Sequence, residues 1–268
     1  MIESDRGVIT DDVLDERYAE TYAQANTRPT QAAMEGFGIS CQAFLGGLVP
    51  EDREARVLDI GCGWGHFVLY LLEQGYANVR GIDVSPSQID VAKDYLGDRV
   101  QLVGSSEEFL AAHPAEFDLV VMLDVFEHIP KTHAVNLLRV IRGSLAEGGT
   151  LLLKVPNMDY PLAVGNRYYD FTHELGYTRE SLHQVLTDAG FSAVTVTGMR
   201  RSIDFRRDGL VRSGRRALRR VVQAAALLPF RFLSFAMEGR PHAVMTISLL
   251  GTGRKDECAR EARCPSTP

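Results

Sequence analysis

Two kinds of hydrophobic pattern alternate between about residue 54 and residue 157. Short runs rich in Val, Leu and Ile, each bounded by Gly, Asp or Pro, predict buried strands. These runs fall at 56–60, 79–83, 100–103, 119–123 and 150–155. Helical patterns separate them, as at 65–74 and 86–95. Strict alternation of strand and helix predicts a parallel sheet with helices on both faces.

The pattern changes after the fifth strand. An irregular aromatic stretch at 156–177 precedes a predicted helix at 179–189 and a strand at 192–197, whose hairpin partner falls at 243–250. We therefore expect an α/β fold with a seven-stranded, mostly parallel sheet whose last strand is antiparallel. The predicted organisation is a helical lid or flank at 1–53, the sheet domain at 54–200 and 241–252, an insertion at 201–240 and a disordered tail at 253–268.

Composition narrows the class of function. The 268-residue chain is 45% hydrophobic and has a formal net charge of −6, which argues against nucleic acid as a partner because phosphate binding favours a basic surface. The sequence shows no C-x-x-C pair, no signal-peptide pattern and no apolar run of about 18 residues. These absences predict a cytoplasmic protein without disulfides or structural zinc.

The first strand runs into VLDIGCGWG, which places Gly61, Gly63 and Gly65 just before a helix. Glycines let the backbone turn sharply and approach a ligand closely. A dinucleotide fingerprint needs a further glycine where His66 stands, which disfavours a nicotinamide enzyme. Asp59 supplies the carboxylate that the amino group of a methionine moiety requires.

Polar residues follow the next strands in the same way. Asp83 ends the second strand in GIDVS, where a carboxylate can accept hydrogen bonds from both ribose hydroxyls. The third strand runs into GSSEEF, where Ser105, Ser106 and Glu107 could meet an adenine edge. The fourth runs into LVVMLDVFEHI. All four segments follow strand carboxyl ends, where ligands of open α/β sheets bind.

These motifs, together with GGTLLLKVPN, resemble class I S-adenosylmethionine-dependent methyltransferases over roughly residues 54–200. The resemblance implies a Rossmann-like methyltransferase sheet that takes S-adenosylmethionine as methyl donor and leaves S-adenosylhomocysteine as product. It assigns the methionine part of the donor to Asp59, Gly61 and Gly63, the ribose to Asp83, and the adenine to Ser106 and Glu107. Asp124 is placed in both the donor site and the catalytic group. Many relatives carry Asp where this chain has Ser105.

The acceptor side is expected to supply a base, because a hydroxyl acceptor needs one whereas an amine needs only to be neutral. His173 is the preferred base, since it sits with Tyr169 and Asp170 in a long loop after the fifth strand. Tyr169 and Asp170 are predicted to shape the acceptor pocket. His128, which follows the fourth strand, is the rival base.

Asp124, Glu127 and His128 lie within one turn of each other. Such a cluster could orient an acceptor or hold a divalent cation, whereas Glu127 could instead cap a helix start or be solvated there. A metal needs three or four ligands, which sequence spacing alone does not place together. We predict no bound metal, and whether a divalent cation assists stays open.

Two resemblances bear on the acceptor. The block YDFTHELGYTRESLHQVLTDAGF resembles bacterial methyltransferases associated with surface polysaccharide and O-antigen sugars, which suggests O-methylation of a sugar or lipid-linked saccharide. The D-x-x-E-H stretch resembles quinone-pathway relatives, which makes a quinone or phenol the alternative acceptor. A nicotinamide-dependent oxidoreductase and a donor-binding scaffold without turnover are less favoured.

The insertion is rich in arginine. On a helix at 211–228, one arc carries Arg212, Arg215, Arg216, Arg219 and Arg220, and the opposite arc is apolar. This composition is typical of an interfacial helix, and it predicts peripheral contact with the inner face of a membrane through 206–237. The alternatives are a flap over the protein's own core or a dimer partner, and polyanion binding. The sequence does not predict the oligomeric state.

Overall fold

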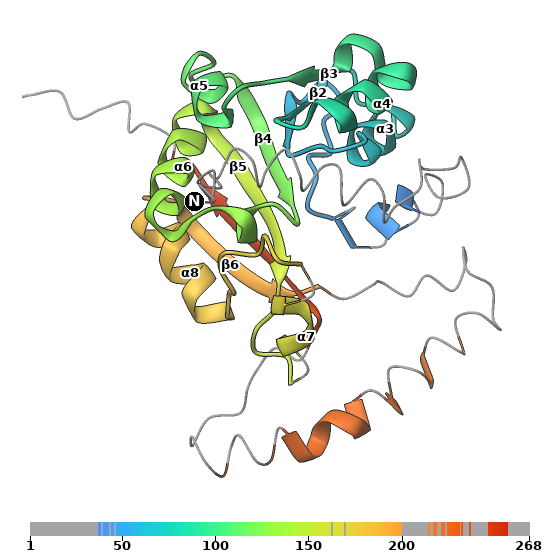
Figure 1. Cartoon of the computed structure of the whole chain (residues 1–268), viewed down its shortest axis with the longest axis vertical. Coiled ribbons are helices and arrows are strands. Elements are labelled where there is room, and N and C mark those ends of the chain that lie inside the picture. The colour runs from blue at the N-terminus through green and yellow to red at the C-terminus, as the bar shows by residue number, and fades with distance from the viewer. Residues whose placement is uncertain are drawn as a thin grey trace, which may run out of the picture.

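A computed structural model describes residues 47–161, 163–168, 170–199 and 246–256, together with scattered positions between 37 and 45 and between 214 and 236. A seven-stranded sheet in the order β3-β2-β1-β4-β5-β7-β6 forms its centre (Figure 1). The strands are β1 Val57–Ile60, β2 Val79–Asp83, β3 Val100–Leu102, β4 Phe117–Leu123, β5 Leu145–Pro156, β6 Ser192–Gly198 and β7 Ser248–Arg254. The expected seven-stranded α/β sheet is thereby confirmed.

Strand direction gives the sheet a defined ligand-binding edge. β1 pairs in parallel with both β2 and β4, and only β7 runs antiparallel, between β5 and β6. The strand order therefore reverses at β1 and β4. In an open parallel sheet, the crevice outside the carboxyl ends at such a reversal is where ligands bind.

Helices cover both faces of the sheet (Figure 1). They are α3 His66–Glu73, α4 Pro86–Leu96, α5 Ser106–Ala111, α6 Lys131–Ser144, α7 Ala163–Tyr168 and α8 Arg179–Asp188, with short 3₁₀ turns η1 Gly97–Arg99 and η2 Phe126–His128. Alternate strand residues supply two cores, because strand side chains point to opposite faces. Leu58 and Val120 pack with α5, α6 and α8, whereas Val57 and Val121 pack with α3 and α4.

The last strand differs most from its expected position. β7 ends at Arg254, four residues beyond the predicted end at Leu250. Gly251 and Gly253 resemble turn residues in the sequence, but packing requires them to be small. A Cβ on Gly253 would lie 2.8 Å from the Cβ of Phe191, so a larger residue cannot fit where β7 passes beneath that ring.

The predicted lid and insertion are described only in part. Helical positions between 37 and 45 bury Cys41 and Leu45 against α3, which places this segment beside the sheet edge. Leu218, Val221 and Leu228 of the insertion are helical and exposed. Tyr169, the five arginines of the predicted basic arc and Cys258 lie outside the described residues. Within the described part of the chain, no helix is both long enough and apolar enough to cross a bilayer.

Candidate active site

A glycine-rich turn connects β1 to α3. Gly61, Gly63 and Gly65 have φ angles of 68°, 53° and 74°, in the left-handed region that residues with a Cβ avoid. A Cβ on Gly61 would also lie 2.5 Å from a methyl carbon of Val125. The turn therefore presents backbone rather than side chains to the space above the sheet, as a closely bound ligand needs.

Asp83 fixes this turn to the end of β2. One carboxylate oxygen accepts a hydrogen bond from the Gly63 N–H at 2.7 Å, and the other accepts from the Ser85 N–H at 2.8 Å. Burial raises the pKa of Asp83, although these backbone donors act in the opposite direction. Each carboxylate oxygen keeps a second lone pair, so Asp83 can still accept hydroxyl donors from a ligand.

Asp59 lies at the carboxyl half of β1 and is 3% exposed. Burial, and then the negative charge of Asp83, raise its pKa well above the ordinary value for an aspartate. A carboxylate in this position is stabilised by a cation. The donor half of the site is thus electrostatically suited to a positively charged amino group.

Ser105, Ser106 and Glu107 adjoin the turn at the start of α5. Ser105 caps this helix: its hydroxyl accepts from the Glu108 N–H and donates to a carboxylate oxygen of Glu107, each at 3.3 Å. An aspartate at this position would cap the helix equally well. All three residues line the same cavity as Asp59 and Asp83.

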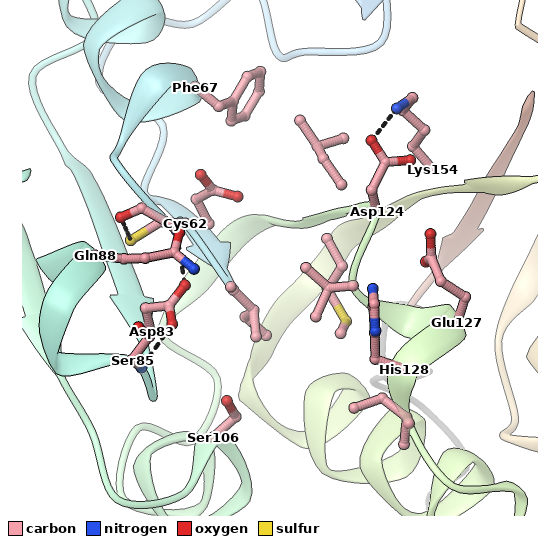
Figure 2. A pocket seen from close by; sticks show the side chains of 18 of the residues that line it. Cys62, Phe67, Asp83, Ser85, Gln88, Ser106, Asp124, Glu127, His128 and Lys154 are labelled. Atoms are coloured by element: carbon pink, nitrogen blue, oxygen red, sulfur yellow. Dashed lines mark hydrogen bonds and ion pairs between the residues drawn. The ribbon is translucent and has the colours of Figure 1, made fainter. Parts of the chain in front are cut away.

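This cavity has a volume of about 1250 Å³ and joins the two halves of the site. Figure 2 shows Asp83, Ser85 and Gln88 on one side, with Asp124, Glu127, His128 and Lys154 on the other. The second group follows β4 and includes one residue of β5. The structure therefore brings together the predicted donor residues and the predicted residues of the fourth-strand motif.

Asp124 begins the acceptor half. Its backbone adopts a left-handed φ of 57°, and its N–H donates to the carbonyl oxygen of Lys154 at 3.0 Å. Its carboxylate forms an ion pair with the Lys154 ammonium group (Figure 2). Asp124 is therefore partly neutralised. The spacing of residues in the sequence does not predict this pairing, because Lys154 lies on another strand.

Glu127 is 1% exposed, and among the described residues neither of its carboxylate oxygens has a hydrogen-bond partner. Burial, and then the charge of Asp124, raise its pKa to about 8. Its carbonyl oxygen accepts from the N–H groups of Glu174 and Leu175, at 2.9 and 3.0 Å. The interpretation of Glu127 as a solvated residue at a helix start is therefore wrong, because the loop after α7 covers it.

His128 is oriented by a relay of two residues from that loop. Its Nδ1 lies 2.8 Å from the Thr172 hydroxyl, which donates to Asp170 at 2.7 Å. Thr172 has one hydroxyl hydrogen, so its oxygen accepts from an N–H at Nδ1 of His128. Nε2 is then the basic nitrogen of the neutral ring. Burial, and then the nearby His173, lower the pKa of His128.

His173 lies beside His128, with ring centroids 4.8 Å apart in an edge-to-face arrangement. Arg167 donates to the carbonyl oxygens of His173 and Glu174, which holds the loop in place. Burial favours a higher pKa for Asp170, but hydrogen bonds from Thr172, and then electrostatic attraction to His128 and His173, keep the pKa below its ordinary value. The two rival bases thus occupy one site. The sequence analysis does not name Thr172 as a site residue, although its position between Asp170 and His173 could have indicated one.

Comparison with known proteins identifies the fold and the family. A family model described as a methyltransferase domain matches residues 39–196, more than half of the chain. The chain belongs to this methyltransferase family. A SAM-dependent methyltransferase from Archaeoglobus fulgidus has a similar structure, with a TM-score of 0.60 and 19% identity over 89% of this chain and 100% of that one.

Curated relatives match a shorter segment. A ubiquinone biosynthesis O-methyltransferase from Aromatoleum aromaticum is 43% identical over 88 residues, which is 30% of this chain and 37% of that protein. A protein of the same name from Xanthomonas campestris is 37% identical over 107 residues, 38% of this chain and 44% of that protein. The matches span less than half the length of these relatives.

S-adenosylmethionine is the methyl donor of this class, and the donor half fits it. The backbone of the Gly61 turn lines the cavity, and buried Asp59 suits the donor's amino group. Asp83 has lone pairs for ribose hydroxyls. The individual contacts remain predictions for Asp59, Asp83, Ser106 and Glu107.

Proposed function

We propose that this protein methylates a hydroxyl oxygen of a phenol- or quinol-type small molecule. The observation that carries the proposal is the shared cavity, in which a donor half with Asp59 and Asp83 faces the pair of His128 and His173. The names of the relatives, ubiquinone biosynthesis O-methyltransferases, support a hydroxyl on an aromatic ring.

The residues divide the work of a displacement at carbon. S-adenosylmethionine, when bound, supplies an electrophilic methyl group. Asp59 and Asp83 would hold its amino and hydroxyl groups, beside the backbone of the Gly61 turn that lines the cavity. The acceptor hydroxyl loses its proton at the histidine pair, because a neutral hydroxyl is a poor nucleophile. Alignment of the two reactants supplies most of the remaining acceleration.

The acceptor half also has apolar lining that suits an aromatic acceptor. Val125 and Ile129 line the same cavity as the two histidines. A flat ring buries apolar area against such walls, whereas a sugar needs many polar partners. Asp124, Lys154 and Asp170 line the same half and could bind sugar hydroxyls, so the names of the relatives decide in favour of the aromatic acceptor. Membrane contact through 206–237 stays a prediction that rests on the sequence pattern and on exposed Leu218 and Leu228.

The test is methyl transfer from isotopically labelled S-adenosylmethionine by the full chain. The acceptors are a panel of dihydroxybenzenes and quinols, a panel of sugars and nucleotide sugars, and a panel of amines. We expect labelled methyl ethers on phenolic oxygen. Labelled sugar alone would support the saccharide interpretation, and labelled amine alone an N-methyltransferase. Tight binding of S-adenosylhomocysteine with no product in any panel would indicate a non-catalytic donor-binding protein.

A further inference from the structure

We propose that Lys154 binds the carboxylate of the methionine moiety of S-adenosylmethionine, so that Lys154 and Asp59 together recognise this moiety as a zwitterion. The donor carries an ammonium group and a carboxylate on one carbon atom. Asp59 suits the ammonium group, but an ionised aspartate cannot bind the carboxylate, because it is an acceptor only. The proposal concerns the donor, so it does not depend on which acceptor the protein methylates.

Lys154 is the cation that the cavity offers. It is the one lysine or arginine among the described residues that line the cavity, and its side chain is 20% exposed. A ligand carboxylate that leaves water needs a charged or hydrogen-bonding partner to offset the cost of desolvation. Of the described lining side chains, the Lys154 ammonium group is the one whose fixed positive charge matches the donor carboxylate.

The register of the sheet places Lys154 and Asp59 on the same face. Asp59 on β1 pairs with Val121 on β4. Two residues further along β4, Leu123 pairs with Lys154 on β5. Paired residues, and residues two apart along a strand, point their side chains to the same face of a sheet. Strand spacing and rise put the Cα atoms of Asp59 and Lys154 roughly 12 Å apart, which leaves room for a small ligand between the two side chains.

The thiol of Cys41 gives an independent indication that both charges face one volume. Cys41 packs on this face of the sheet with Val121 and lines the same cavity. Burial, and then the negative charge of Asp59, raise the pKa of Cys41 to about 12, whereas the positive charge of Lys154 acts to lower it. A thiol that responds to both charges lies near both of them. The space beside Cys41 therefore has a carboxylate on one side and an ammonium group on the other.

The ion pair with Asp124 orders Lys154 before a ligand binds. The two side chains meet at the wall of the cavity (Figure 2). An ammonium group has three N–H donors, so Lys154 can bind Asp124 and a ligand carboxylate at the same time. A lysine that is already held in place loses less side-chain entropy on binding than a mobile one.

The test compares two ligands on the full chain by isothermal titration calorimetry. S-adenosylhomocysteine has the complete amino acid moiety, whereas decarboxylated S-adenosylhomocysteine keeps the amine and lacks the carboxylate. We expect the parent protein to prefer the first ligand by about 10–100-fold, because hydrogen bonds to charged groups are strong. In Lys154→Met this preference should disappear, while the affinity for the decarboxylated ligand stays almost unchanged.

Three further variants make the comparison specific. Lys154→Arg keeps the positive charge and should keep the preference. Lys93→Met removes the same charge from the exposed face of α4, and should change neither affinity. Lys154→Gln is a second neutral variant at the site, and circular dichroism shows whether each neutral variant folds, so that a folded one decides.

A preference that persists in a folded neutral variant would overturn the proposal, and would place the carboxylate at the N–H groups of the Gly61 turn instead. Equal affinity of the parent protein for the two ligands would overturn it as well. Equal weakening of both ligands in Lys154→Met would also contradict it, because Lys154 would then act only on the structure of the site. The assay contains no acceptor, so a failure of the proposed phenol methylation would leave this result unchanged.

Discussion

The two halves of the cavity are built in different ways. The donor half consists mainly of backbone: glycines with left-handed φ and N–H groups bound by Asp83, all directly after consecutive strands. The acceptor half consists of side chains that meet across long sequence distances, such as His128 and Thr172, 44 residues apart. The donor half resembles a fixed frame for one ligand, whereas the acceptor half can vary with its loop.

Because the two halves are built differently, substitutions in each half should change different measured quantities. Substitutions in the donor half should alter donor affinity and the stability of the turn. Apart from those of Lys154, substitutions in the acceptor half should alter turnover while donor affinity stays constant. A change that affects both would show that the halves are coupled, and Val125 is the described residue that touches the turn from the acceptor side.

The largest expected effect is on turnover in the acceptor half. His128→Ala and His173→Ala should each depress kcat by about 10²–10⁴-fold, because a hydroxyl is a poor nucleophile without a base. Affinity for S-adenosylhomocysteine should stay within a few-fold of the parent value. Steady-state kinetics and calorimetry measure the two quantities, with exposed His183→Ala as control. If only one of the two variants loses turnover, that histidine is the base.

The next effect tests the packing of the Gly61 turn in the donor half. Gly61→Ala places a Cβ 2.5 Å from Val125 at a φ of 68°, so strain and overpacking should together destabilise the fold by about 2–5 kcal/mol. In the double variant with Val125→Ala, the stability lost through the contact with Val125 should be recovered, and the loss caused by the left-handed φ should remain. Denaturant unfolding of both single variants and the double variant gives the coupling. Additive losses would show that the two halves do not touch through this pair.

A somewhat smaller effect is expected at Asp83. Asp83→Ala should weaken S-adenosylhomocysteine binding by about 100-fold, because hydroxyl donors lose a charged partner and the Gly63 and Ser85 N–H groups lose theirs. Isothermal titration calorimetry measures the loss. Asp90→Ala on the exposed face of α4 is the control. Binding at parental strength in Asp83→Ala would place the ribose elsewhere.

Most of the sheet and the donor half could be predicted from the sequence, because the signals are local. The strand ending at Asp83 was predicted with its final bounds, since β-rich residues and the turn residues that stop them lie within a few positions. The Gly61 turn needs only its neighbours to be recognised. The end of β7 was predicted too early, because Gly251 and Gly253 look like turn residues in the sequence. In the structure they lie within the strand, where α8 packs on Gly251 and Phe191 packs on Gly253.

The acceptor half could be predicted only as separate motifs. The E-H pair and the loop around His173 were recognisable, but nothing in the spacing shows that Thr172 contacts His128 or that Lys154 pairs with Asp124. Burial of Glu127 depends on the loop after α7 folding back over it. Such contacts arise from tertiary structure, so a single sequence does not contain them as local patterns.

The smallest expected effect concerns pH and the donor half. The pKa of Asp59 is raised, so in the donor-free protein its protonated form favours the fold, and that stability is lost as pH rises through the raised pKa. A cationic donor binds the ionised form instead. Donor affinity should therefore fall by up to about tenfold per pH unit below the raised pKa, which lies well above 3.8. Binding should also release a proton in that range.

Calorimetry with S-adenosylhomocysteine in two buffers of different ionisation enthalpy measures this proton release directly. In Asp59→Asn the release should disappear, and affinity should become weak and almost independent of pH, because the amide neither titrates nor attracts a cation. Asp118→Asn is the matched control: Arg56 holds the pKa of Asp118 low at the other end of the sheet, so its loss should leave the linkage unchanged. Parental proton release in Asp59→Asn would assign the titrating group to Asp83, whose pKa burial also raises, and the donor's amino group would then lie nearer β2 than β1.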